Sequence, residues 1–376
     1  MTSYVFKPTK LMIPGPIEVE EEVLKVMGGP VQAHYGAEFA EYYKETTRLL
    51  KEVFETRGDV FVFVGPGSVG LDACIGSAFS TGDKVLVGVN GFFGQRLCEI
   101  ANHNGLEIVA IEGKWGDLLD PKEFANALVR HPGIKGILVV HLETSTSVIN
   151  PIEEISQIAH RYHVPIVVDA VSSLGGVPMH MDEWGIDFCA SASQKCLGSP
   201  PGLAPVAVSQ HGWEIVDSNP NKAHGWYTDL RVWRRYSTDW ADWHPFPITM
   251  ASSNLIALHT SIESLVSEGV ANRIERYRKL AIRLRQGLRR IGFEPLTPDE
   301  LLAPVITAAY GPPGIPTGQI VAYLAEVHNI RIAGGLGELK DRIIRIGHMS
   351  PKTTEEDIDR VVQALEQFVL ERIQAN

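Results

Sequence analysis

The segment Pro165-Ile166-Val167-Val168-Asp169 is an apolar run that ends in a single carboxylate. A strand without alternating polar residues is buried on both faces, which is typical of a parallel sheet covered by helices. Open sheets of this kind bind ligands at the carboxyl ends of their strands. The segment therefore predicts an α/β fold and places Asp169 at the edge of the sheet where a ligand would bind.

Strand and helix signals alternate on both sides of this segment. Repeated strand–helix–strand units predict an α/β domain with a mainly parallel sheet and helices on both faces. The expected strands are 60–64, 84–89, 107–111, 136–140, 186–190 and 204–209, and the expected helices are 71–80, 94–104, 121–130 and 152–163.

The pattern changes after residue 210. Segment 213–247 holds five of the seven tryptophans without a clean period. A helix is expected over 254–268, followed by a basic amphipathic helix over 272–290 whose arginines should face solvent. The remaining elements predict a smaller α/β unit, with strands 304–309, 330–332 and 343–347 and helices 317–328 and 353–373. We place the domain boundary near residue 270, so that residues 1–270 form an N-terminal segment plus a large domain, and residues 271–376 form a small C-terminal domain.

Composition excludes several classes of protein. The 376 residues include 34 Lys+Arg and 45 Asp+Glu, a net charge of −11 that argues against nucleic-acid binding. No apolar run approaches the roughly 18–20 residues that span a bilayer, and residues 1–10 lack a stretch of signal-peptide length. The four cysteines contain no C-x-x-C pair, so we expect no metal site, and buried thiols in a reducing cytoplasm.

Gly65-Pro66-Gly67-Ser68-Val69-Gly70 follows an apolar strand and matches the dinucleotide pattern G-x-G-x-x-G. That reading also needs an acidic residue after the next strand, which ends here in Gly88-Val89-Asn90-Gly91. Pro66 removes a backbone N–H from the loop. A single phosphate at a helix N-terminus, aided by the Ser68 hydroxyl, fits better, and the alternative is a tight turn without ligand.

Three charged residues have both a functional and a structural interpretation. Asp169 is a partner for a cationic ring nitrogen or a metal, or else a helix cap. Lys195, in Ser193-Gln194-Lys195, is a Schiff-base lysine or a surface residue. Arg345, in Ile344-Arg345-Ile346, binds a carboxylate with its planar fork or forms an internal salt bridge.

Together, a phosphate cradle, a carboxylate, a lysine and an arginine supply what pyridoxal phosphate chemistry requires. The sequence resembles the class V aminotransferases of fold type I, and within them the alanine/serine–glyoxylate/pyruvate aminotransferase group. The resemblance covers essentially the whole chain. The motifs that carry it are Pro14–Pro16, Val89–Arg96, His141–Thr146, Val168–Gly176, Ser193–Lys195 with Pro200–Gly202, and Gly334–Gly337 ahead of Arg345–Gly347.

The resemblance implies a role for each matching residue. Lys195 would be the Schiff-base lysine and proton carrier, and Asp169 would pair with the pyridine nitrogen. The other cofactor contacts would come from Ser68, Val69 and Gly70 at the phosphate with Gln194, from Phe93 on the ring and from Thr144 near the ring hydroxyl. Arg345 and the backbone at Gly15 would bind the substrate carboxylate. The family is typically a homodimer in which a partner hydroxyl reaches the phosphate, and Thr249 is the candidate, although segment 244–254 departs from the mammalian pattern.

The implied activity is transfer of an amino group from alanine or serine to glyoxylate or pyruvate. Pro14–Pro16 and Phe93 predict a small pocket, which Trp226 and Tyr227 either narrow further or serve only by packing. A related lyase such as a cysteine desulfurase needs a reactive cysteine on a late loop, and this chain has none after Cys196. The remaining alternatives are a nicotinamide-dependent oxidoreductase, which lacks its ribose acid, and a non-catalytic binding protein.

Overall fold

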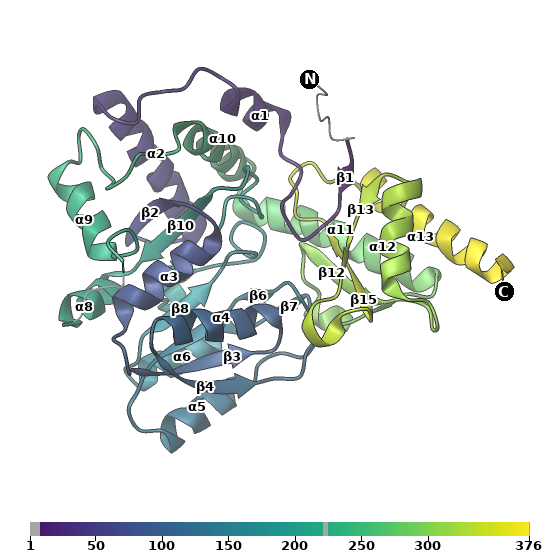
Figure 1. Cartoon of the computed structure of the whole chain (residues 1–376), viewed down its shortest axis with the longest axis horizontal. Coiled ribbons are helices and arrows are strands. Elements are labelled where there is room, and N and C mark those ends of the chain that lie inside the picture. The colour runs from purple at the N-terminus through teal and green to yellow at the C-terminus, as the bar shows by residue number, and fades with distance from the viewer. Residues whose placement is uncertain (1–7, 221–224, 376) are drawn as a thin grey trace.

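A seven-stranded sheet forms the centre of the computed structural model, which describes residues 8–220 and 225–375 (Figure 1). Neighbouring strands are parallel except on both sides of β10, so the expected mainly parallel sheet is confirmed. In spatial order the strands are β2 (Asp59–Val64), β10 (Leu203–Val208), β9 (Phe188–Ala190), β8 (Ile166–Asp169), β5 (Ile134–Val140), β3 (Lys84–Val89) and β4 (Glu107–Glu112).

Residues 1–7, 221–224 and 376 lie outside the described part of the chain. The first group includes most of the N-terminal stretch considered above, and the second belongs to the tryptophan-rich segment. Within the described ranges, no helix combines the length and the apolar character that crossing a membrane requires.

Strand β8 occupies the middle of the sheet, as its composition predicts. All four of its residues are buried. Its register places Asp169 between Val140 of β5 and Ala190 of β9. Asp169 therefore lies at the carboxyl ends of three adjacent parallel strands, which is the edge where the sequence placed it.

Helices cover the sheet and connect its strands. Helices α3 and α4 contact each other, and between them they pack on β3, β4, β9 and β10. The helices of this region are α1 (Glu21–Met27), α2 (Ala37–Phe54), α3 (Gly67–Ala78), α4 (Phe92–His103), α5 (Pro121–Arg130), α6 (Ile152–Arg161), α7 (Met181–Trp184), α8 (Gln210–Ser218), α9 (Leu230–Asp239) and α10 (Ser252–Glu268).

Helix α3 begins at Gly67, four residues before the expected start at residue 71. The two glycines of its first turn are unfavourable in a helix by propensity alone, so the pattern placed them in a loop. Tertiary packing explains the difference. A Cβ at Gly67 would overlap the side chain of Val171, and one at Gly70 would lie 2.9 Å from Val206. Their small size lets the helix start close to the sheet.

The tryptophan-rich segment contains two helices, α8 and α9, although no clean period was found in it. Trp233 of α9 is fully buried, with its ring centroid 4.0 Å from that of Phe63. Trp226, Trp240 and Trp243 are about half exposed. These three lie outside the two helices, whose own tryptophans, Trp213 and Trp233, are buried.

The C-terminal part has its own four-stranded sheet and a second cluster of buried apolar side chains. Its strands, in spatial order, are β11 (Glu294–Pro295), β12 (Ile306–Tyr310), β15 (Ile343–Gly347) and β14 (Ala333–Gly334). Its helices are α11 (Val270–Arg290), α12 (Thr317–Val327) and α13 (Glu355–Ala375), and it also has 3₁₀ turns at Asp299–Leu301 and Gly337–Leu339. The domain boundary near residue 270 stays a prediction.

Helix α11 corrects one expectation about its arginines. Arg273 and Arg285 are buried instead of facing solvent. Arg273 Nε lies 2.5 Å from Glu268 Oε2, and Arg285 Nε lies 2.8 Å from Asp299 Oδ1. Each buried guanidinium is neutralised by a carboxylate outside the helix, which a helical pattern alone does not reveal.

The N-terminal segment joins the C-terminal part of the fold. Strand β1 (Lys10–Leu11) pairs in parallel with β13 (Ile330–Arg331), and Met12 is buried in the C-terminal apolar cluster. Lys10 Nζ lies 2.8 Å from both Glu18 and Asp357. Figure 1 shows the segment running from α1 down between the two parts of the molecule. This course brings Pro14 and Gly15 to the carboxyl edge of the large sheet.

Candidate active site

Lys195, in the loop after β9, is held against the N-terminal segment. Its ammonium group donates a hydrogen bond to the carbonyl of Pro14. A Cβ added to Gly15 would lie 2.8 Å from Lys195 Nζ, and Gly15 has a φ of +93°, so this position favours glycine for two reasons. Burial lowers the pKa of Lys195 to about 8, and the positive charge of Arg345 adds to the effect. The interpretation as a surface lysine is wrong.

Asp169 is buried at the end of β8, where its Oδ1 accepts a hydrogen bond of 2.9 Å from the backbone of Val171. Burial raises the pKa of Asp169 to about 6, and the nearby charge of Glu143 adds to this shift. The carboxylate makes a local turn, but no helix begins here, because the next one, α7, starts at Met181, so the interpretation as a helix cap is wrong. The carboxylate also lies close enough to Lys195 for their charges to influence each other.

The first turn of α3 carries Ser68, Val69 and Gly70. The backbone at Gly67 packs tightly against two side chains. A Cβ added there would overlap Val171 and would lie 3.2 Å from the Cβ of Ala192. These contacts place the helix N-terminus beside the segments that follow Asp169 and precede Lys195. Ser68 itself is exposed.

Tyr227 supports the strand that leads into the glycine-rich turn. Its hydroxyl donates a hydrogen bond of 2.5 Å to the carbonyl of Val64 at the end of β2. Its ring meets Phe63 edge to face, with centroids 5.7 Å apart. Tyr227 thus packs on the core, which is the simpler of the two roles expected for it, while Trp226 remains 53% exposed.

Arg345 of β15 is a buried cation held by backbone carbonyls. Its Nε donates to Gly334 at 2.8 Å and its Nη1 to Thr144 at 3.1 Å. Within the described residues, no carboxylate lies at ion-pair distance, so the salt-bridge interpretation is wrong. Burial lowers the pKa of Arg345 to about 10. A buried guanidinium without an acidic partner is suited to an anionic ligand.

Two further candidate residues have buried polar atoms without a hydrogen-bond partner in the described part of the chain. The hydroxyl of Thr144 and the Oε1 atom of Gln194 are buried and have no hydrogen-bond partner among the described residues. Buried polar atoms of this kind normally have partners, so both atoms are suited to contact a polar ligand.

Phe93 lies in the first turn of α4, partly buried against the large core. The guanidinium of Arg96 lies 5.1 Å from its ring centroid. Thr249, by contrast, is exposed ahead of α10. Its expected contact involves a partner subunit and stays a prediction.

Glu143 also belongs to the site, although no pattern in the sequence assigns it a role. It is fully buried in β6 (Leu142–Glu143), a strand that pairs with β7 (Val148–Ile149). Its carboxylate accepts hydrogen bonds of 3.0 Å from the backbones of Phe93 and Gly94. The available signal was a carboxylate closing the apolar run 137–143, the same signal that singled out Asp169.

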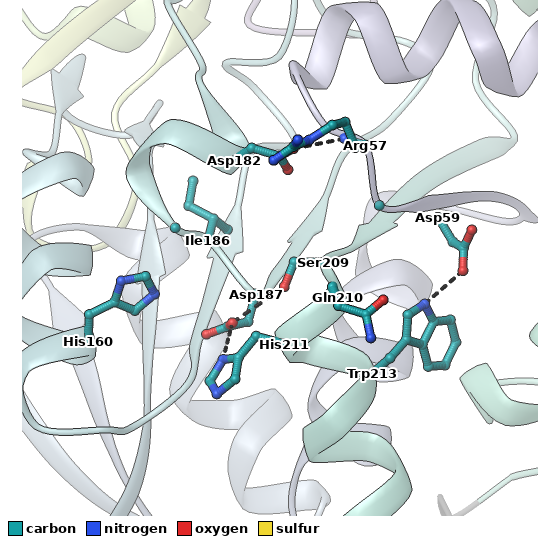
Figure 2. Close-up of a pocket in the computed structure, with 12 residues that line it drawn as sticks. Arg57, Asp59, His160, Asp182, Ile186, Asp187, Ser209, Gln210, His211 and Trp213 are labelled. Carbon is teal, nitrogen blue, oxygen red and sulfur yellow. Dashed lines mark hydrogen bonds and ion pairs between the residues drawn. The ribbon is translucent and has the colours of Figure 1, made fainter.

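The cavity drawn in Figure 2 lies elsewhere, at the opposite edge of the large sheet. It has a volume of about 440 Å³. Asp59 begins β2 and Asp187 precedes β9, so these residues mark the amino ends of strands whose carboxyl ends carry the site. Asp187 accepts a hydrogen bond of 2.7 Å from His211 there. The cavity has no part in the arrangement around Lys195.

A lysine, an aspartate and an arginine therefore meet a helix N-terminus at the carboxyl edge of a mainly parallel sheet, which defines an α/β enzyme site for an anionic ligand. The model of the family "Aminotransferase class-V" matches residues 17–361. An uncharacterized aminotransferase of Methanocaldococcus jannaschii is 37% identical, with 90% of this chain and 87% of that protein covered.

Solved structures agree with this family. The alanine–glyoxylate aminotransferase of Nostoc sp. is 31% identical with a TM-score of 0.93, covering 98% of this chain and 97% of that one. The ureidoglycine–glyoxylate aminotransferase of Bacillus subtilis is 30% identical, also with a TM-score of 0.93, covering 98% and 95%. The chain belongs to the class-V aminotransferases and is an enzyme of that type with the type I fold of pyridoxal phosphate enzymes.

Proposed function

We propose that this enzyme is a pyridoxal phosphate-dependent transaminase that moves an amino group from a small amino acid, alanine or serine, to a small 2-oxo acid. The observation that carries the proposal is Arg345, a buried cation with no carboxylate at ion-pair distance among the described residues, beside the buried amine of Lys195. Two of the similar proteins are named for glyoxylate, which supports glyoxylate as the acceptor, with pyruvate as the alternative.

The residues present fit the cofactor. When bound, pyridoxal phosphate supplies an electron sink for the charge that develops at the substrate's α-carbon. Backbone N–H groups of Ser68 and Gly70 would hold its phosphate, because a helix N-terminus carries partial positive charge. The N–H of Val69, which was expected to join them, already donates to the carbonyl of Pro66 at 2.9 Å. The unpartnered polar atoms of Thr144 and Gln194 would meet its polar groups.

Asp169 and Phe93 would orient the ring of the cofactor. The Asp169 carboxylate would accept a hydrogen bond from the protonated ring nitrogen, whose positive charge would offset the cost of ionising this buried acid. Phe93 would lie against the face of the ring.

Lys195 would move the proton at its Nζ atom. A pKa of about 8 leaves a substantial fraction of the amine neutral near physiological pH, so Nζ can accept the α-proton of the substrate. The same amine can then return the proton at a neighbouring carbon. The carbonyl of Pro14, which accepts from Nζ, holds the side chain on this side of the site.

Arg345 would bind the substrate carboxylate, aided by the backbone at Gly15. Two backbone carbonyls fix its guanidinium, and its remaining N–H groups can form a bidentate pair. Pro14 and Gly15 approach Lys195 closely, which supports a preference for small substrates.

The proposal extends to assembly and compartment. A homodimer would bring Thr249, which is exposed, toward the phosphate of the partner subunit's site. All four cysteines are free thiols, and three of them are buried, which supports a reducing cytoplasm as the working environment.

Two alternatives from the sequence are less well supported. A lyase that transfers sulfur needs an accessible thiol, and burial raises the pKa of Cys196 to about 12. The function of a nicotinamide-dependent oxidoreductase would not explain why Lys195 is buried beside Arg345.

The purified protein is expected to be yellow and to transfer the amino group of alanine or serine to glyoxylate. Borohydride reduction followed by peptide mapping should locate the cofactor on the peptide that contains Lys195. A panel of amino donors against glyoxylate, pyruvate and 2-oxoglutarate identifies the substrates. A colourless protein that takes up no pyridoxal phosphate would refute the proposal.

Arg345→Lys is expected to raise the KM for the carboxylate substrate by about tenfold to a hundredfold, because a point charge replaces a bidentate fork. Steady-state kinetics with the best donor provide the measurement. Arg342→Lys is the matched control, since Arg342 is exposed three residues earlier. Equal KM values for the wild type and the Arg345→Lys variant would show that Arg345 does not bind the substrate carboxylate.

A further inference from the structure

The carboxylate of Glu143 lies among hydrogen-bond donors on both sides. Its Oε2 accepts from the backbone N–H groups of Phe93 and Gly94, each at 3.0 Å. Its Oε1 accepts from Ser145, at 3.0 Å from the backbone N–H and 2.5 Å from the hydroxyl. Ser145 Oγ in turn accepts from the backbone of Phe92 at 2.9 Å. Three consecutive N–H groups of α4 are thus satisfied from one distant loop.

This arrangement is more costly than an ordinary helix cap. A serine or aspartate at position 91 would cap α4 locally, without burying a charge. The chain instead has Gly91 there and brings a carboxylate from 50 positions beyond Phe93. A Cβ at Gly91 would overlap the Glu143 side chain. A role as a structural cap alone does not explain why a charged side chain is buried here.

The loop that carries Glu143 also holds the substrate arginine. The carbonyl of Thr144 accepts the hydrogen bond from Arg345 Nη1. One residue before it, Glu143 fixes the first turn of α4, where Phe93 lies. The peptide of Glu143 and Thr144 therefore connects the residue that faces the cofactor ring to the residue that faces the substrate carboxylate.

We propose that Glu143 is a positioning residue that fixes Phe93 and Arg345 relative to each other through residues 143–145. This inference rests on the proposed function, which supplies the roles of those two residues. The negative charge is needed because both oxygens face only donors. A glutamine at this position would direct its NH₂ group either against the N–H groups of Phe93 and Gly94 or against the N–H of Ser145.

The substitution Glu143→Gln should therefore displace both Phe93 and Arg345. The KM for the carboxylate substrate is expected to rise about tenfold or more, with a smaller change in kcat. The dissociation constant of pyridoxal phosphate, titrated into the apo-protein by fluorescence, should rise several-fold. Steady-state kinetics, this titration and thermal unfolding of the apo-protein are the three measurements.

Asp187→Asn provides the matched control, because Asp187 is also a buried carboxylate that accepts a backbone N–H, from Ile166 at 2.9 Å. It precedes β9 at the opposite edge of the sheet and lines the cavity drawn in Figure 2. We expect this variant to lose stability while its KM and cofactor affinity stay those of wild type. If Glu143→Gln behaves in the same way, Glu143 is only structural and the proposal is overturned.

Ser145→Ala covers the case in which Glu143→Gln does not fold. It keeps the charge but removes one donor to Glu143 and the acceptor for Phe92, so a smaller rise in both constants is expected. Unchanged constants would overturn the proposal. Failure of the proposed function is seen separately, in a wild-type apo-protein that binds no pyridoxal phosphate, and the inference about Glu143 then falls with it.

Discussion

Lys195→Ala is expected to lower transaminase activity by at least about 10²–10⁴-fold, the usual contribution of a positioned acid–base group. In the proposed mechanism no neighbouring amine replaces it, because Arg345, whose pKa burial lowers only to about 10, keeps its proton at neutral pH. The measurement is kcat with the best donor, under conditions in which the variant is saturated with pyridoxal phosphate.

The matched control is Lys84→Ala. Lys84 begins β3 at the other end of the sheet and forms an exposed ion pair with Glu107 at 3.2 Å. We expect it to leave kcat unchanged. An Lys195→Ala enzyme with full activity would contradict the assignment of the catalytic amine.

Asp169→Asn is expected to have opposite effects on catalysis and on stability. Asparagine cannot supply the negative charge that keeps the ring nitrogen protonated, so kcat should fall by roughly 10²-fold or more. The apo-protein should nevertheless become more stable, because the buried carboxylate of the wild type is costly to ionise. Asparagine also keeps an oxygen that can accept the hydrogen bond from Val171.

The sign of the stability effect follows from the pKa. Burial raises the pKa of Asp169 from 3.8 to about 6, so the folded wild-type chain binds its proton more tightly than the unfolded chain. Its contribution to stability is complete below pH 4 and is lost as the pH rises to about 6. The advantage of Asp169→Asn should therefore grow over this interval and reach on the order of 3 kcal/mol above it.

Urea unfolding of the apo-protein between pH 4 and pH 8 measures this advantage. Asp182→Asn is a control of opposite sign: burial raises the pKa of Asp182, but hydrogen bonds from Thr56 and Arg57 outweigh burial and lower it. That variant should be less stable than wild type at neutral pH. An Asp169→Asn protein that loses stability at pH 8 would contradict the buried-acid explanation.

Features that depend on local pattern could be predicted from the sequence. The apolar run before Asp169 identified a central strand, and the amphipathic period of residues 272–290 identified helix α11, in which Tyr277, Leu280 and Leu284 are buried. Lys195 and Arg345 stood out because charged residues adjoin otherwise apolar strands. In each case a few neighbouring residues determine burial.

Features that depend on distant partners could not be predicted. The start of α3 is set by Val171, which lies a hundred positions away from Gly67. The carbonyl partners of Arg345 come from Gly334 and Thr144, and no side-chain pattern marks a carbonyl. Glu143 ends an apolar run as Asp169 does, but its four hydrogen bonds come from backbone and hydroxyl groups whose approach only the folded chain defines.

The pairing of β1 with β13 has a consequence for the order in which the molecule is made. Lys10 meets Ile330, so a ribosome working at roughly 5–20 residues per second needs about 16–60 s between the two. All strands of the large sheet leave the ribosome during that interval, and β1 stays unpaired until β13 has been synthesised. The wall that Pro14 and Gly15 contribute beside Lys195 is thus completed near the end of synthesis, and a chain cut short before Ile330 lacks it.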